Sequence, residues 1–301
     1  MNINSRLLKL RRSMLYVPAD NKRAMEKCMV LDADCVIFDL EDAVAPQNKE
    51  IARENLRDYF SAHPTAHFER AIRINPLKSE WGTEDFMCAR ACMPSAIVLP
   101  KVSKAADVRQ LNDALDQSDA ALEMEIFAMI ETASGVLNIG DIAALGQSRD
   151  TRLSTLIVGL NDLVKDTRIG GSQKDIRKTA HSWLMQIVLG ARAGSLDIID
   201  AVYNDIRDVA GFSAECLVGA QMGFDGKTLI HPVQIEAANH AFMPSESDLI
   251  KAGKIVRAFG EPQNASIGVL ALDGEMIERL HFEQAEQLLA KAAMIEARKR
   301  S

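Results

Sequence analysis

The sequence lacks any uninterrupted apolar segment long enough to cross a membrane, which excludes a spanning helix and predicts no membrane partner. Cysteine is scarce. An odd total of five, without a secretory signal, argues against a disulfide scaffold and predicts reduced thiols in a cytoplasmic protein. Positive charge is also in short supply, because 35 Lys and Arg stand against 42 Asp and Glu. The net charge of −7 argues against nucleic acid as a partner, although a local cationic pocket can still bind an anionic substrate.

Low-complexity tracts are absent, and 48% hydrophobic with 26% charged residues is the balance of an ordinary globular protein. Two pairs of potential metal ligands, Cys88 with Cys92 and His63 with His67, each have a spacing of four. Neither pair has a second ligand pair nearby in the sequence. We therefore interpret the cysteines as buried thiols rather than as a metal site.

Eight short apolar runs alternate with helix-like segments, and nearly every run ends at a polar or charged residue. The runs are residues 13–18, 35–42, 70–75, 96–101, 125–131, 155–162, 196–201 and 227–232. Their apolar character is continuous rather than alternating, as in strands covered on both faces. Eight strand–helix units predict an α/β protein with the TIM (β/α)8 barrel fold, which places its chemistry at the C-terminal ends of the strands.

Helical patterns predict helices at residues 49–62, 83–92, 104–115, 132–145, 175–193 and 213–222. Residues 159–171 are polar, contain glycine and have no clear period, so we expect a long loop after the sixth strand. The first twelve residues carry four basic groups and no acid, like a targeting peptide. Because a strand begins directly afterwards, we interpret them as a lead-in whose Arg11 and Arg12 can serve an anionic ligand at the barrel mouth.

The barrel is assigned to residues 1–240, and residues 241–301 exceed what it requires. A mostly helical segment over 234–258 is interrupted at Pro244 and Ser245. The turn Asp273-Gly274 predicts a hairpin of residues 267–272 and 276–280, and a last helix is expected at 282–297. This helix–hairpin–helix extension can cover a barrel mouth, its own or a neighbouring subunit's.

Two carboxylates end neighbouring strands of the predicted barrel, because Glu131 closes the fifth strand and Asp162 follows the sixth. Adjacent strands lie about 5 Å apart, so both carboxylates can share one cation. Two carboxylates, with the remaining positions left to water and ligand oxygens, suit Mg²⁺, and Mn²⁺ can substitute. Alternatively, each carboxylate is a helix cap or an ion-pair partner.

Further charged residues end the second and third strands. Asp39, Glu41 and Asp42 crowd one strand end, where three carboxylates repel unless cations or hydrogen bonds compensate. They can hold metal-bound water, orient a nearby arginine or, for one of the three, cap a turn. Arg73 can bind a carboxylate or donate to a developing oxyanion.

Two more polar groups follow the fourth and eighth strands. Lys101 can form a Schiff base, but with so many carboxylates nearby we favour a solvent-facing or ion-paired lysine. His231, which precedes Pro232, can act as a general base or hold a turn, and we favour a structural or ligand-lining role.

Seven segments in order along most of the chain resemble the citrate lyase beta-subunit family, within the HpcH/HpaI aldolase group that includes malyl-CoA and citramalyl-CoA lyases. They are RSMLYVPADN, VIFDLEDAV, AIRIN, VLPK, MIETASGV, IVGLNDL and FDGKTLIHPVQI. Each motif alone is weak, but seven in the right order are specific. The resemblance implies a TIM barrel with a C-terminal extension, assembled as a homotrimer or hexamer.

The resemblance also implies roles for individual residues. Glu131 and Asp162 are its Mg²⁺ ligands. Its catalytic residues are Arg73, Asp42 and Glu278. Its residues for binding the CoA thioester and the 2-oxo acid are Tyr16, Arg73, Glu41, Asp39, Lys101, Pro232 and Arg12.

The reaction that the resemblance implies is reversible carbon–carbon cleavage of a carboxylated 3-hydroxyacyl-CoA thioester, of the malyl-CoA or citramalyl-CoA type, into an acyl-CoA and a 2-oxo acid. Mg²⁺ stabilises the alkoxide, Arg73 stabilises the thioester enolate, and a carboxylic acid protonates the enolate carbon. In the family this acid is an aspartate of the extension that reaches a neighbour's site. Here Glu278 stands at the matching position, and Leu280 stands where a proline often follows. A displacement of about 1 Å can cost on the order of 100-fold in rate.

Three other functions stay open. The chain can be a citryl-thioester lyase subunit that acts on an acyl carrier protein, or a barrel that binds metal and ligand without catalysis. It can also be a pyruvate aldolase for free aldehydes, although such an enzyme needs no extension to cover a thioester.

Overall fold

The computed structural model describes residues 8–261, 264 and 267–300. The chain forms two compact units, one of residues 11–242 and one of residues 8–10 with the described part of residues 243–301. In the first unit, eight parallel strands close into a barrel in chain order, with β8 paired to β1. The strands are β1 (Ser13–Pro18), β2 (Cys35–Asp39), β3 (Glu69–Arg73), β4 (Ala96–Leu99), β5 (Glu125–Ile130), β6 (Leu153–Val158), β7 (Asp197–Asp200) and β8 (Gly226–Leu229).

The barrel strands are apolar on both faces because both faces are buried. Side chains such as Ile37, Val98, Phe127 and Ile157 form one cluster inside the barrel. Their neighbours along each strand, Phe38 among them, belong to a second cluster that the surrounding helices cover. Such burial explains the continuous apolar runs. The predicted α/β TIM barrel is confirmed.

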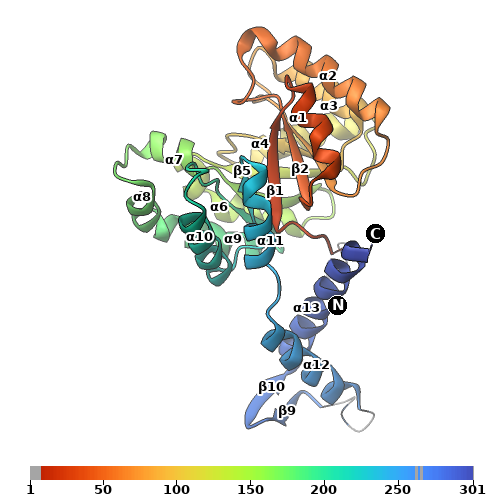
Figure 1. The fold of residues 1–301 in the computed structure, drawn as a ribbon, viewed down its shortest axis with the longest axis vertical. Coiled ribbons are helices and arrows are strands. Elements are labelled where there is room, and N and C mark those ends of the chain that lie inside the picture. The colour runs from red at the N-terminus through yellow and green to blue at the C-terminus, as the bar shows by residue number, and fades with distance from the viewer. Residues whose placement is uncertain (1–7, 262–263, 265–266, 301) are drawn as a thin grey trace. The chain divides into compact units, whose positions relative to one another are not determined.

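Helices surround the barrel, with α1–α3 on one side and α7, α8 and α10 on another (Figure 1). They are α1 (Lys22–Lys27), α2 (Lys49–Ala62), α3 (Gly82–Cys92), α4 (Ala105–Gln117), α5 (Ala133–Leu137), α6 (Ile139–Ala144), α7 (Leu160–Thr167), α8 (Gln173–Thr179), α9 (His181–Ala193), α10 (Val209–Met222) and α11 (Ile235–Ala241). Short 3₁₀ helices are η1 (Cys28–Val30), η2 (Pro46–Asn48), η3 (Leu145–Gln147) and η4 (Pro232–Gln234).

The long loop predicted at residues 159–171 is wrong, because helix α7 begins directly after β6. Leu160 and Leu163, three residues apart, bury the inner face of this short helix. The helix ends at Thr167, and the next residue, Arg168, adopts a left-handed conformation with φ of 58°. The segment expected to form one helix at 175–193 is divided at Ala180 into α8 and α9.

Arg11 closes the N-terminal end of the barrel rather than its mouth. Its guanidinium lies 2.7 Å from Glu69, 2.5 Å from Glu125 and 2.7 Å from Asp197, and it stacks over the Phe127 ring at 4.6 Å. Three carboxylates around one buried guanidinium satisfy its donors and leave it no free face for a ligand.

Arg12 has a comparable structural partner. It forms two hydrogen bonds of 2.8 Å to Asp34, and both side chains are buried. Like Arg11, it precedes β1 and therefore lies at the opposite end of the barrel from the C-terminal strand ends. The expectation that Arg11 or Arg12 serves an anionic ligand at the mouth is corrected accordingly.

The second unit contains the predicted helix–hairpin–helix, formed by α12 (Glu246–Gly260), β9 (Val269–Leu272), β10 (Glu275–Glu278) and α13 (Arg279–Arg300). Asp273 and Gly274 both have positive φ, 49° and 85°, as a tight two-residue hairpin turn requires. Ile255, Phe259 and Ile277 join the helices and the hairpin in a small apolar core. No helix among the described residues is long and apolar enough to cross a membrane.

Candidate active site

Arg73 and Asp39 form the fixed centre of the barrel mouth. The guanidinium donates to the two carboxylate oxygens over 2.7 Å from Nε and 2.6 Å from Nη2. Asp39 also accepts the backbone N–H groups of Glu41 and Ala43, at 2.9 and 3.0 Å. Burial opposes its charge, but Arg73 and these backbone groups outweigh burial and lower the pKa of Asp39. Of the roles left open for Asp39, the geometry favours orienting an arginine.

Glu41 lies between two cations. Its Oε1 accepts a hydrogen bond from Lys101 Nζ at 2.9 Å, and its Oε2 lies 3.0 Å from Arg73 Nη1. Oε2 is nevertheless buried without a hydrogen bond of good geometry, and burial raises the pKa of Glu41. Asp42 is more exposed and lies 4.0 Å from Lys101 Nζ. Two cations thus compensate the three carboxylates only in part.

Lys101 contributes to the site through its backbone as well as its ammonium group. It adopts a left-handed conformation with φ of 55°, which is uncommon for a residue with a Cβ. This conformation directs its backbone N–H to Glu131 Oε1 at 2.7 Å. Burial opposes the charge on the ammonium, but Glu41 outweighs it and raises the pKa of Lys101. Of the two alternatives to a Schiff base, a solvent-facing or an ion-paired lysine, the contact with Glu41 agrees with the ion pair.

Glu131 follows β5 and is buried, with 2% of its surface exposed. Burial and the nearby charges of Glu41 and Asp162 raise its pKa to about 8. Asp162 lies in the first turn of α7, three residues after Gly159. The two predicted metal carboxylates therefore meet at the mouth, from the end of one strand and from the helix that follows the next.

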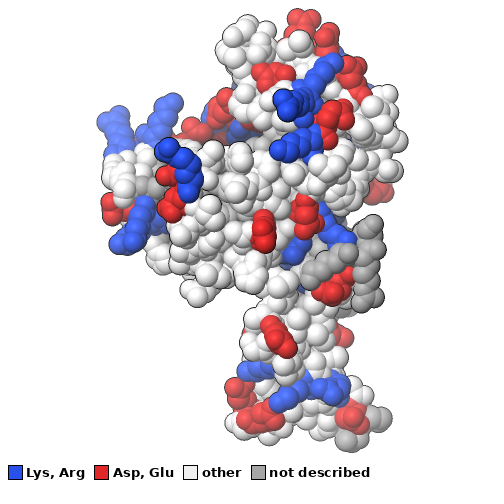
Figure 2. Space-filling view, in the orientation of Figure 1, with Lys and Arg blue, Asp and Glu red and all other residues white. Residues whose placement is uncertain are grey.

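Two hollows open beside these carboxylates. One of about 300 Å³ is lined by Tyr16, Asp39, Asp42, Arg73, Met129, Glu131, Asp162, Thr228 and Ile230, among others. The other, of about 390 Å³, is lined by Lys101, Glu131, Thr132, Asp162, Lys165, Asp166 and Arg168. Lys and Arg side chains gather over the α7–α8 region, from which Lys165 and Arg168 come (Figure 2). Glu131 and Asp162 line both hollows.

The mouth fits a divalent cation. Burial and the charges of Glu41 and Asp162 raise the pKa of Glu131, and Glu41 Oε2 is buried without a hydrogen bond, so added positive charge would stabilise these carboxylates. The donors are carboxylate oxygens, which hard cations such as Mg²⁺ prefer. Among the described residues, no three His, Cys, Asp or Glu side chains are grouped to enclose a metal by themselves. A cation held here would therefore keep positions for water and ligand oxygens.

A model of the HpcH/HpaI aldolase/citrate lyase family matches residues 12–232. The chain belongs to this family. It is 42% identical over 288 residues to a (3S)-malyl-CoA thioesterase of Cereibacter sphaeroides, covering 95% of this chain and 96% of that protein. It is 31% identical to the mitochondrial citramalyl-CoA lyase of Rattus norvegicus, over 95% of this chain and 87% of that protein. Its fold also matches a crystal structure of protein CitE from Mycobacterium tuberculosis in complex with magnesium, acetoacetate and coenzyme A. The TM-score is 0.72 at 30% identity, covering 93% of this chain and 97% of that one.

This match confirms the family to which the seven motifs pointed. The family model is that of aldolases and citrate lyase, and relatives over nearly the whole chain include a citrate lyase beta subunit and a citramalyl-CoA lyase, so the chain is an enzyme of the lyase type, as predicted. The family model spans all eight barrel strands and ends at Pro232, so it covers every residue that lines the two hollows.

The remaining predicted binding residues lie at different distances from this centre. Tyr16 lines the smaller hollow beneath Arg73, whose guanidinium lies 4.7 Å from the ring centroid. Pro232 begins η4, just beyond Ile230 of the same hollow. His231 caps η4, because its Nδ1 accepts the Val233 backbone N–H at 3.2 Å, which agrees with a structural role.

Glu278 belongs to the second unit, so the barrel unit forms the mouth without it. It ends β10, is exposed, and its backbone N–H donates to His281 Nδ1 at 3.0 Å. Its predicted part in catalysis stays a prediction.

Several residues that shape the mouth had no clear signal in the sequence. Lys49 is buried and donates to the carbonyls of Leu40 and Glu41, at 2.6 and 2.7 Å, which fixes the turn after β2. The sequence pattern of the helix that Lys49 begins does not indicate that its ammonium group is buried. Lys165 and Arg168 were hidden within the expected loop. Their spacing of three, at the end of an amphipathic turn, is the signal that could have found them.

The two ligand pairs considered in the sequence have other surroundings in the structure. All five cysteines are free and buried. His63 contacts Glu26 at 3.0 Å, whereas His67 contacts the Leu31 carbonyl at 2.8 Å. The interpretation of Cys88 and Cys92 as buried thiols agrees with these contacts.

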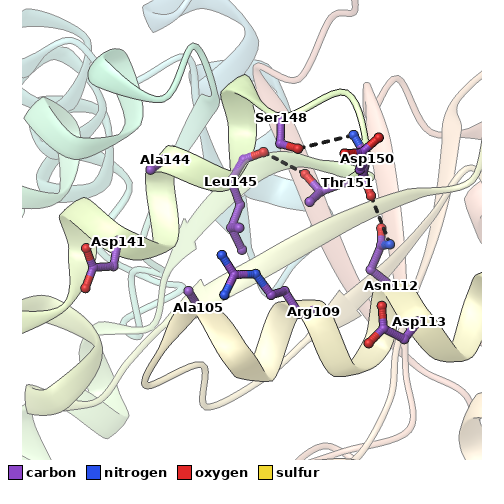
Figure 3. Close-up of a pocket in the computed structure, with 10 residues that line it drawn as sticks. All are labelled: Ala105, Arg109, Asn112, Asp113, Asp141, Ala144, Leu145, Ser148, Asp150 and Thr151. Atoms are coloured by element: carbon purple, nitrogen blue, oxygen red, sulfur yellow. Dashed lines mark hydrogen bonds between the residues drawn. The ribbon is translucent and has the colours of Figure 1, made fainter.

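A third hollow, of about 620 Å³, lies away from the mouth between α4 and the segment from α6 to Thr151 (Figure 3). Arg109 extends into it from α4, and Asp141 borders it from α6. These side chains are exposed, and the hollow shares no residue with the two at the mouth. It is therefore a separate hollow from the two at the barrel mouth.

Proposed function

We propose that this enzyme is a Mg²⁺-dependent carbon–carbon lyase that cleaves a malyl-CoA or citramalyl-CoA type thioester into an acyl-CoA and a 2-oxo acid. One observation carries the proposal: two carboxylates suited to Mg²⁺, Glu131 and Asp162, share one hollow with the guanidinium of Arg73. The CitE structure, which holds magnesium, acetoacetate and coenzyme A, supports the same ligand classes for this chain.

Glu131 and Asp162 would hold the cation, which when bound supplies positive charge to the oxygens of the 2-oxo acid fragment. Arg73 is rigid, since Nε and Nη2 are committed to Asp39. Its Nη1 is not bound to Asp39 but lies 3.0 Å from Glu41 Oε2, and it would be the donor that turns to an enolate oxygen. A fixed guanidinium supplies this stabilisation without reorganising during the reaction.

Two carboxylates are candidates for the acid that protonates the enolate carbon. Asp42 lines the smaller hollow, and Glu278 is the residue that the family pattern places there from a neighbouring subunit in a trimer or hexamer. Lys165 and Arg168 line the other hollow and would attract the anionic parts of a CoA thioester.

Thioester hydrolysis is the second candidate reaction. It is favoured by the 42% identity, over nearly all of both chains, to a protein named (3S)-malyl-CoA thioesterase. In this reaction water would cleave the thioester bond of malyl-CoA and leave its carbon–carbon bond intact. The products would be free CoA and malate.

A product analysis separates these functions. Purified enzyme with Mg²⁺ is incubated with malyl-CoA or citramalyl-CoA, and the products are resolved by chromatography, with Glu131→Gln as the control variant. A 2-oxo acid and acyl-CoA in equal amounts support the lyase, whereas free CoA with the intact hydroxy diacid supports the thioesterase. Turnover of carrier-protein thioesters alone would instead favour a citrate lyase subunit. Binding without turnover would favour a non-catalytic role.

A further inference from the structure

Gly159 lies against the carboxylate of Glu131, although its backbone conformation does not require glycine. Its φ is −104°, a value that any residue adopts. A Cβ built on it would nevertheless overlap Glu131 Oε2 and would lie 2.5 Å from Glu131 Cβ. The glycine is therefore needed for space rather than for conformational freedom.

Rotation of the Glu131 side chain would not relieve this overlap. Glu131 Cβ is fixed by the backbone at the end of β5, so only the carboxylate could turn away. The backbone of Gly159 is fixed as well. Its N–H donates to the Ile130 carbonyl at 3.1 Å, and its carbonyl accepts the Leu163 N–H at 3.1 Å to begin α7.

The Glu131 carboxylate is thus held between two backbone segments. On one side, the left-handed Lys101 donates its N–H to Oε1. On the other side, Oε2 occupies the space that a Cβ of residue 159 would need. Gly159 also caps the helix whose first turn carries Asp162.

We infer that Gly159 is a positioning residue that sets the place of both metal carboxylates, by leaving room for Glu131 and by starting the helix that carries Asp162. The inference rests on the proposed function in so far as these carboxylates hold a divalent cation. A side chain at position 159 would push the Glu131 carboxylate from its place.

The test uses Gly159→Ala in the full chain, with Gly170→Ala as the matched control, since a Cβ at Gly170 meets nothing within 4 Å. Mn²⁺ affinity is measured by the loss of the free-ion paramagnetic resonance signal. We expect Gly159→Ala to weaken Mn²⁺ binding by about tenfold or more, as changes next to metal ligands do. The Mg²⁺ concentration for half-maximal activity should rise in parallel, with part of the lost rate restored at high Mg²⁺. Gly170→Ala should match the wild type.

A second measurement separates positioning from a general loss of stability. In the Glu131→Gly background the obstructing side chain is gone, so adding Gly159→Ala should lower the melting temperature less than it does in the wild type. The cost of alanine at a helix N-cap is common to both backgrounds and cancels. If Gly159→Ala fails to fold, the double variant should fold.

Two results would overturn the inference alone: unchanged Mn²⁺ affinity in Gly159→Ala, or an equal fall in melting temperature in both backgrounds. Absence of Mn²⁺ binding by the wild type would reject the metal, and with it both the inference and the proposed function.

Discussion

Arg73 Nε and Nη2 contact the two oxygens of Asp39 at 2.7 and 2.6 Å, at paired positions on neighbouring strands. Both side chains are buried, and the pair compensates two opposite charges at the floor of the smaller hollow. With Nε and Nη2 bound to Asp39, Nη1 of Arg73 is directed at Glu41. Arg73 and Glu131 line the same hollow. Asp39 thus determines the direction in which Arg73 offers its remaining donor.

Arg73→Lys keeps the charge but removes the two-point contact with Asp39. We expect kcat to fall by about 100-fold or more, because a donor to a developing oxyanion is lost. We also expect stability to fall by about 3 kcal/mol, because a buried carboxylate loses its partner. Steady-state kinetics and urea unfolding measure the two effects. Wild-type kcat in this variant would contradict the role of the guanidinium.

Glu131→Gln replaces one of the crowded buried carboxylates by a neutral group of the same shape. Without metal, the variant should be at least as stable as the wild type, because repulsion from Glu41 and Asp162 is relieved. With Mg²⁺ at 100 times its dissociation constant, the wild type should gain about 2.7 kcal/mol and the variant much less. Thermal unfolding with and without Mg²⁺ measures the stability of both proteins under both conditions. Equal Mg²⁺ stabilisation of both proteins would exclude Glu131 as a ligand.

Lys101 should not form a Schiff base. Its Nζ donates to Glu41, which raises the pKa of Lys101 and keeps the amine protonated, whereas a nucleophilic lysine must be neutral. Borohydride reduction in the presence of pyruvate or glyoxylate should leave the protein mass unchanged. Lys101→Met is the control. An adduct present in the wild type but absent from this variant would show that Lys101 does form a Schiff base.

Asp200 should contribute to stability in a pH-dependent way. It is fully buried and accepts hydrogen bonds from Arg177, at 3.0 and 2.9 Å, and from Lys227, at 2.9 Å. Burial opposes its charge, but the two cations outweigh it and lower the pKa of Asp200. Because the folded pKa lies below the unfolded value of about 3.9, the contribution is present above that value and is lost as pH falls through the folded pKa.

Asp200→Asn should therefore lower stability by about 3 kcal/mol at neutral pH and reduce its dependence on pH below about 4. Urea unfolding between pH 3 and pH 7 gives both quantities. The same acid dependence in variant and wild type would show that other carboxylates dominate.

The parts of the site that could be predicted from the sequence follow from parallel topology. Charged residues that follow apolar runs must meet at one end of a parallel barrel, which brings Asp39, Arg73 and Glu131 together without knowledge of any contact. The same rule, applied strictly, places Arg12 at the other end, because it precedes its strand. Arg12 therefore pairs with Asp34 at that end and not with a ligand at the mouth.

Contacts that depend on exact distances could not be predicted. The left-handed backbone of Lys101 and the close approach of Gly159 to Glu131 arise only once three strand ends are in place. Helix α7 was missed because two buried leucines in a polar segment give a weak periodic signal. The buried network around Asp200 combines residues from two strands and two helices, which no local pattern indicates.

Glu278 can be tested as an acid supplied by a neighbouring subunit. If each site combines Arg73 of one subunit with Glu278 of the next, then Arg73→Met and Glu278→Gln are each inactive alone. Refolding the two variants together should restore up to about one quarter of wild-type activity, because random assembly in a closed ring joins an intact Arg73 to an intact Glu278 at that frequency. Mixing Arg73→Met with Glu131→Gln, both altered in the barrel unit, is the control and should restore nothing. If Glu278→Gln is active by itself, the acid lies elsewhere, and Asp42→Asn, altered at the remaining carboxylate of the hollow, should then be the inactive variant.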